Sequence, residues 1–109
     1  MTVRALKTSD DYKTATTGSG FAAILFHAAW DESSKALKSE VEKYAKNERY
    51  SQVQYYAVDI AEAEDIAMDS GVKLTPTVHF LKDGAKVSEY TGSSAPAFER
   101  ALAASLAGH

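Results

Sequence analysis

The 109-residue sequence contains no cysteine. This absence excludes disulfide bonds, thiolate nucleophiles, zinc–thiolate sites and iron–sulfur clusters. Proline and glycine are scarce, with two and six residues, so collagen-like repeats and low-complexity linkers are excluded as well. The rest of the composition, 45% hydrophobic and 25% charged, is typical of a globular protein. At this length we expect one domain spanning residues 1–109.

The sequence also lacks a concentration of positive charge. Its net charge is −3, and the twelve lysines and arginines are dispersed among acidic residues, so we expect no nucleic-acid partner. The longest apolar run, residues 21–30, is well short of the roughly 20 residues that a membrane-spanning helix needs. The first residues lack the basic-then-apolar layout of a signal peptide. These absences predict a soluble, cytoplasmic protein without a membrane partner.

The central part of the chain carries the clearest structural pattern. Residues 21–29 are apolar without alternation, which predicts a strand buried on both faces of a sheet. Asp31 follows as a helix N-cap, and apolar residues recur at helical spacing up to residue 49. Counting back three residues from Leu37 places Ser34 on the inward face of that helix.

The remaining elements follow from capping residues, turn residues and periodicity. Asp59 and Glu62 predict a capping box before a helix over residues 61–70, and Asp83-Gly84 predicts a two-residue hairpin turn. We expect strands over residues 2–6, 53–58, 77–81 and 85–90, and helices over residues 8–16, 61–70 and 96–106. This order predicts an α/β fold with a mixed sheet between helices.

Several motifs in this order resemble the thioredoxin family. Residues 30–35, WDESSK, stand where the family carries Trp-Cys-Gly-Pro-Cys-Lys, between the central strand and the long helix. Thr75-Pro76 stands where the family has its cis-proline, and Asp83-Gly84 and Thr91-Gly92 match its later turns. The resemblance covers about the whole chain. It implies a thioredoxin-like fold with a central sheet of about five strands flanked by about four helices.

The departures from the family pattern fall on its chemistry. The degenerate active-site positions are Asp31, Glu32, Ser33 and Ser34, with Asp31 and Ser34 in place of the two thiols. Leu25 and Tyr55 replace the buried acid and the lysine that the family uses in proton transfer. A carboxylate and a hydroxyl do not exchange with disulfides, so the sequence predicts no thiol–disulfide oxidoreductase activity.

Two other chemistries were weighed at these residues. A hydrolase or transferase-like enzyme would use the Asp31–Ser34 helix start with His27 as base, but the sequence offers no oxyanion site, and capping explains Asp31 better. His27 and His79 would be metal ligands if their strands were neighbours, but no third ligand stands at a fixed spacing. We therefore expect no catalytic residue, metal or cofactor.

The resemblance leaves protein binding as the expected function. The residue before the family's cis-proline pairs through its main chain with an extended peptide, and this pairing needs no cysteine. Trp30, at a strand-to-helix turn, would anchor the partner. The expected partner is a protein or an extended peptide, and the expected contact residues are Trp30, Asp31, Thr75, Pro76, Thr91, Gly92 and Ser93. The alternative is a purely structural domain of a larger assembly.

Overall fold

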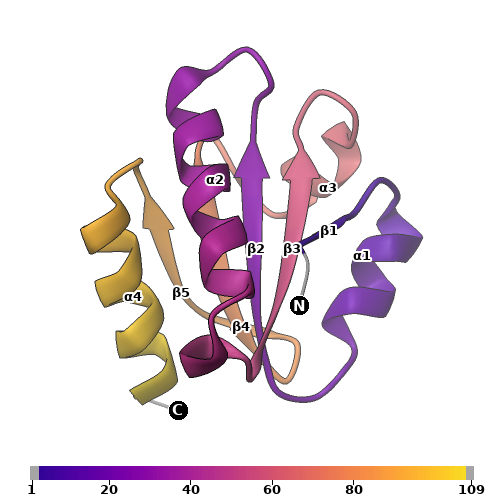
Figure 1. Ribbon diagram of the computed structural model, residues 1–109. Helices are drawn as coiled ribbons and strands as arrows, with labels where there is room; N and C mark the ends of the chain where they lie inside the picture. Colours follow the sequence, from indigo (N-terminus) through magenta and orange to yellow (C-terminus); the bar gives the residue numbers. More distant parts are fainter. Residues whose placement is uncertain (1–2, 108–109) are drawn as a thin grey trace.

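The computed structural model describes residues 3–107, in which a five-stranded sheet lies between two layers of helices (Figure 1). The first half of the chain forms β1 (Arg4–Ala5), α1 (Ser9–Thr16), β2 (Phe21–His27), α2 (Glu32–Ala45) and a short 3-10 helix (Glu48–Tyr50). The second half forms β3 (Val53–Asp59), α3 (Glu64–Asp69), β4 (Thr77–Lys82), β5 (Ala85–Thr91) and α4 (Ala95–Ala107). Within the described residues, the predicted five strands and four helices are thus confirmed.

The sheet has the strand order β1-β3-β2-β4-β5, with β2 at its centre. β3 pairs in parallel with β1 and β2, whereas β4 is antiparallel to β2 and forms a hairpin with β5. The parallel strands require helical crossovers, which α1 and α2 supply. The mixed sheet predicted from the order of elements is therefore present.

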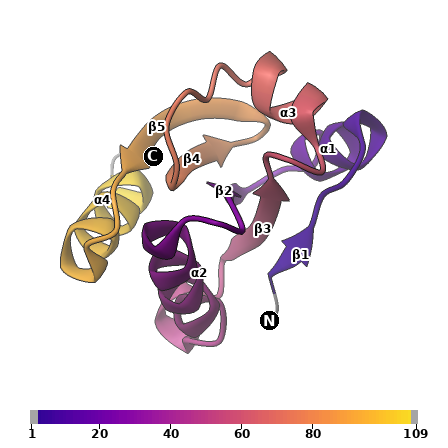
Figure 2. The same cartoon turned by 90° about the horizontal axis from the view of Figure 1, so that it is seen from above.

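The two faces of the sheet are covered by different helices (Figure 2). α2 and α4 lie on one face, and α1 and α3 lie on the other. Side chains of β2 alternate between the two, with Ala23 and Leu25 under α2 and Ile24 and Phe26 toward α3. This double coverage explains why the sequence of β2 is continuously apolar, as predicted.

The larger of the two apolar clusters joins α2 and α4 to the sheet. Leu25 and Tyr55, the two positions that the sequence resemblance matched to the family's acid and lysine, both lie inside it. Leu25 is fully buried, and burial raises the pKa of the Tyr55 phenol well above its usual range. The other buried members are Ala23, Leu37, Val41, Ala45, Tyr50, Val53, Val78, Phe80, Phe98 and Leu102.

The hairpin turn between β4 and β5 has the geometry expected of Asp-Gly. Asp83 and Gly84 both have positive φ angles, 51° and 86°, which match a two-residue type I′ turn. The turn is tied to the loop after α1, because the Asp83 carboxylate accepts a hydrogen bond from the Gly20 N–H at 2.7 Å. Asp83 also donates its own N–H to the Gly20 carbonyl at 2.9 Å.

The long helix is shorter than predicted. α2 begins after Asp31 as expected, but it ends at Ala45 instead of residue 49. The cause is Asn47, whose side chain accepts a hydrogen bond from the Arg49 N–H and starts the 3-10 helix. A residue that caps a new helical turn competes with continuation of the previous helix.

The predicted capping box at Asp59 is wrong. The Asp59 carboxylate accepts hydrogen bonds from the N–H groups of Ala61 and Glu62, which closes a turn instead of starting a helix. α3 begins only at Glu64 and has no side-chain cap. A capping box does form at the start of α1, where Thr8 and Asp11 bond reciprocally to each other's backbone.

Two strands are also shorter than predicted. β2 ends at His27 instead of residue 29, because the Ala28 N–H is bound by the Ser34 side chain instead of a neighbouring strand. β1 pairs with β3 only over Arg4–Ala5, and residue 2 of the predicted strand lies outside the described residues. Within residues 3–107, no helix is long and apolar enough to cross a membrane.

We predict that Gly84→Ala destabilises the fold. The added Cβ would meet the carbonyl oxygen of Thr16, and a positive φ strains an L-residue by about 1–3 kcal/mol even without that collision. Urea unfolding should therefore show a loss larger than this range for Gly84→Ala. Gly20→Ala, with positive φ but open space, should lose less, and Gly18→Ala should be nearly neutral. Equal losses of stability in all three variants would show that neither the positive φ angle nor the collision with Thr16 makes Gly84 special.

Candidate functional site

The site is organised around the carboxylate of Asp31, the N-cap of α2. Its Oδ1 accepts a hydrogen bond from the Ser33 N–H at 3.1 Å. Its Oδ2 accepts two more, from the hydroxyl of Ser34 at 3.1 Å and from the hydroxyl of Thr75 at 3.2 Å. The predicted N-cap is thus confirmed, and the same carboxylate joins the start of α2 to the loop before β4.

Ser34 connects this helix start to the end of β2. Its side chain is buried, as the helical spacing predicted, with 1% of its surface exposed. The hydroxyl accepts a hydrogen bond from the Ala28 N–H at 3.1 Å while it donates to Asp31. A buried hydroxyl engaged as both donor and acceptor is not presented to a substrate, so this geometry gives no support to a nucleophilic serine here.

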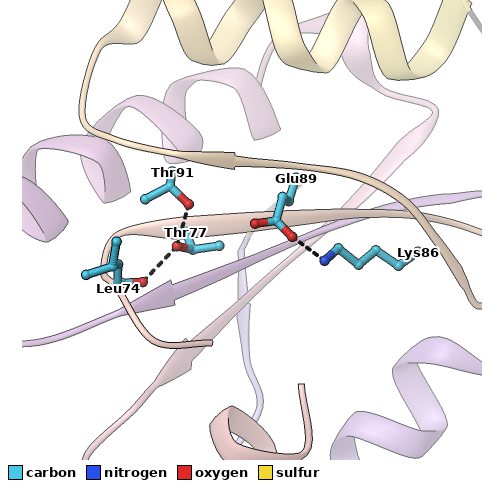
Figure 3. Close-up of polar contacts among 5 residues, drawn as sticks. All are labelled: Leu74, Thr77, Lys86, Glu89 and Thr91. Atoms are coloured by element: carbon cyan, nitrogen blue, oxygen red, sulfur yellow. Dashed lines mark hydrogen bonds and ion pairs between the residues drawn. The ribbon is translucent and has the colours of Figure 1, made fainter. Parts of the chain in front are cut away.

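The loop before β4 carries a cis peptide bond between Thr75 and Pro76, as the family resemblance implies. Pro76 is buried, and its carbonyl accepts a hydrogen bond from the Gly92 N–H at 3.1 Å. The hydroxyl of Thr77 donates to the Leu74 carbonyl at 2.7 Å and lies 2.9 Å from the hydroxyl of Thr91 (Figure 3). These bonds fix the loop against the end of β5.

Not every predicted site residue joins this arrangement. The Glu32 side chain is exposed and forms an ion pair with Lys35 at 3.3 Å. Ser33 and Ser93 are exposed, and within residues 3–107 neither side chain makes a hydrogen bond. The bonded set is therefore Asp31, Ser34 and Thr75, with Pro76, Thr91 and Gly92 beside it.

Trp30 is highly exposed, with 69% of its surface accessible, so it does not pack as a lid on the core. Two further large apolar side chains, Leu74 at 68% and Met68 at 77%, are exposed in the part of the chain the structure describes. Sequence reasoning missed both. Leu74 immediately precedes Thr75, and Met68 lines a cavity of about 220 Å³ together with Thr75. An apolar residue directly before the Thr-Pro pair was the available signal.

The two strand histidines do not form a metal site. Their strands are neighbours, but His79 pairs with Ile24, and its ring packs at a tilt against that of Phe26, at 4.9 Å between ring centroids. His27 is three residues beyond Ile24, so the two imidazoles point to opposite faces of the sheet. Among the described residues, no cluster of three or more His, Cys, Asp or Glu is arranged to hold a metal ion.

Comparison with known proteins agrees with this geometry. The thioredoxin family model matches residues 3–104. The chain belongs to the thioredoxin family. It is 33% identical to a thioredoxin of Aspergillus fumigatus over 83% of this chain and 82% of the relative. It is 30% identical to thioredoxin-2 of Saccharomyces cerevisiae over 95% of this chain and 99% of the relative.

The likeness extends to the solved structure of Malassezia sympodialis thioredoxin. The TM-score is 0.88 at 27% identity, with 94% of this chain and 90% of the other covered. The thioredoxin fold is therefore established for this chain. Its 109 residues nevertheless contain no cysteine, so the chain itself supplies no thiolate for disulfide exchange.

We predict that Ser34→Ala destabilises the protein by about 1–3 kcal/mol, because it leaves the buried Ala28 N–H without its hydrogen-bond partner. The matched control is Ser33→Ala, which removes an exposed hydroxyl that makes no hydrogen bond and should change stability by less than about 0.5 kcal/mol. Urea unfolding of the two variants gives the comparison. A similar effect of both substitutions would show that the Ala28–Ser34 bond contributes little.

We also predict acid destabilisation through His79. Burial lowers the pKa of this imidazole from 6.5, Lys86 lowers it further, and Glu89, which is ion-paired with Lys86 (Figure 3), opposes the shift. The unfolded chain then binds the proton more readily, so stability falls as pH drops below 6.5. His79→Leu should lose less stability than the wild type between about pH 7.5 and about pH 5. If His79→Leu lost as much stability as the wild type over this pH range, His79 would not be the group that causes the acid destabilisation.

Proposed function

We propose that this protein is a redox-inactive member of its family that binds an extended segment of a protein partner. The partner would lie on a docking surface that we define by the contact residues expected from the sequence, with one addition. Leu74 joins them because it is exposed beside Thr75. The docking surface therefore consists of Trp30, Asp31, Leu74, Thr75, Pro76, Thr91, Gly92 and Ser93.

The placement of exposed apolar side chains carries this proposal. Within residues 3–107, the large apolar side chains that are exposed are Trp30, Met68 and Leu74, and each is connected to Thr75 in a different way. Leu74 precedes it in the chain, Met68 shares a cavity with it, and Trp30 precedes Asp31, to which Thr75 donates a hydrogen bond. Exposed aromatic and aliphatic residues gathered at one place are typical of protein-interaction sites.

The main chain at the same place supports an extended partner. Thr75 lies between α3 and β4, and within the described residues its N–H and C=O make no hydrogen bond. An extended peptide can satisfy both groups by adding a short strand, which requires no side-chain chemistry. The hydrogen bonds of Asp31 and Gly92 to this loop would keep it in one conformation before the partner binds. Binding would therefore cost little conformational entropy in the loop.

The alternatives receive less support. A hydrolase or transferase-like enzyme would need an accessible nucleophile at the helix start, where Ser34 is buried and fully engaged in hydrogen bonds. A purely structural domain of a larger assembly would expose a large apolar patch away from Thr75. In the region the structure describes, the large exposed apolar residues are instead next to Thr75 in the chain, share a cavity with it, or adjoin Asp31, to which it is hydrogen-bonded.

We predict that a peptide selected from a library of extended sequences changes the emission of Trp30, because this residue is the only tryptophan of the chain. Leu74→Ser should weaken that peptide's affinity by about tenfold or more, the size expected of an anchor residue. Calorimetry measures the affinity for the wild type, for Leu74→Ser and for Trp30→Ala.

Lys43→Ala is the matched control, because Lys43 lies on the solvent-exposed side of α2 and pairs with Glu40. It should leave the affinity unchanged. The proposal fails if peptides that bind tightly are unaffected by both Trp30→Ala and Leu74→Ser, or if binding leaves Trp30 emission unaltered.

A further inference from the structure

A cavity of about 380 Å³ lies outside the docking surface. It opens at the ends of the three parallel strands, beside the β1 edge of the sheet. Leu6 follows β1, His27 ends β2 and Asp59 ends β3, and all three line it. Of the three side chains that form the Asp31, Ser34 and Thr75 hydrogen bonds, Ser34 lines it.

The chain topology produces this opening. The loop after β2 leads to α2 on one face of the sheet, whereas the loop after β3 leads to α3 on the other face (Figure 2). Loops that leave two adjacent parallel strands in opposite directions create a crevice at the carboxyl ends of these strands. Ligands of open α/β sheets bind at such a switch point, and the cavity volume is within the range of small-molecule sites.

Charges of both signs line the cavity. α2 contributes Lys35 and Lys38, whereas Asp59 ends β3 and Glu62 lies in the loop that follows. His27 lies between them: burial and then Lys38 lower its pKa, and Asp59 and Glu62 oppose the shift. The imidazole is therefore neutral at pH 7 and available as a hydrogen-bonding group.

The charges that face each other across the cavity are not paired. Lys35 forms an ion pair with Glu32, which does not line the cavity, and among residues 3–107 no ion pair links Lys38 to Asp59 or Glu62. Lys7 and Glu42 also line the cavity, which gives three lysines and three carboxylates in all. Lys38 precedes Glu42 by one helical turn, the less favourable order for an ion pair on a helix, and this pair is not formed either.

We infer that this cavity binds a small zwitterion, such as a free amino acid or a dipeptide. Its carboxylate would face Lys38, and its ammonium group would face Asp59 and Glu62, with His27 and Ser34 as neutral polar neighbours. Equal numbers of positive and negative residues disfavour a polyanion such as a nucleotide. The described residues also provide no cluster suited to a metal ion.

The test is an NMR titration of the full chain with diglycine, with acetate and with methylammonium at equal millimolar concentrations. Diglycine should give saturable shifts of the amides of His27, Ser34 and Asp59, and the two singly charged probes should not. Lys38→Gln and Glu62→Gln should each weaken diglycine binding about fivefold, as expected for one partly exposed charge. Lys43→Gln, on the same helix but outside the cavity, should have no effect.

Three outcomes would overturn the inference. Acetate or inorganic phosphate binding as tightly as diglycine would identify a simple anion site. Shifts that do not saturate at these residues would identify a cavity that holds only solvent. Equal weakening by Lys43→Gln and Lys38→Gln would assign the effect to the overall charge of the protein.

Discussion

One carboxylate holds the candidate site of this molecule together. Asp31 accepts hydrogen bonds from the Ser33 N–H and from the hydroxyls of Ser34 and Thr75, and Ser34 in turn accepts from Ala28. The end of β2, the start of α2 and the loop before β4 are thereby linked without a covalent bond. A capping aspartate also lies where the dipole of α2 favours negative charge, so the interaction that starts the helix also positions the loop.

The interior beneath this site is consistent with the loss of thiol chemistry. Leu25 and Tyr55, which the sequence resemblance matched to the proton-transferring acid and lysine of the family, are both buried in the apolar cluster under α2 and α4. A buried carboxylate or ammonium carries a large desolvation cost that only a functional need offsets. Once no thiol has to be deprotonated, apolar packing at these positions is the more stable arrangement.

The sequence was sufficient for those features that depend on neighbouring residues. The N-cap at Asp31 and the order of strands and helices follow from local patterns, and both are present. Two kinds of feature could not be predicted from the sequence: those in which one side chain can satisfy two alternative local structures, and those that depend on contacts between residues far apart in the chain. Asp59 satisfies a turn in preference to a helix start, and the bond from Thr75 to Asp31 joins residues 44 positions apart.

Disulfide exchange and the proposed docking use different atoms. Disulfide exchange requires sulfur, whereas the extended partner that we propose would pair with the main chain of Thr75 and pack on apolar side chains such as Trp30 and Leu74. The hydrogen bond between Gly92 and the Pro76 carbonyl, which helps to fix this loop, also involves only backbone atoms. The absence of both thiols therefore removes the reaction but not the groups that the proposed docking needs, provided that the start of α2 remains capped. Asp31 meets that condition, because the residue that stands in place of a thiol also caps the helix and accepts the hydrogen bond from Thr75.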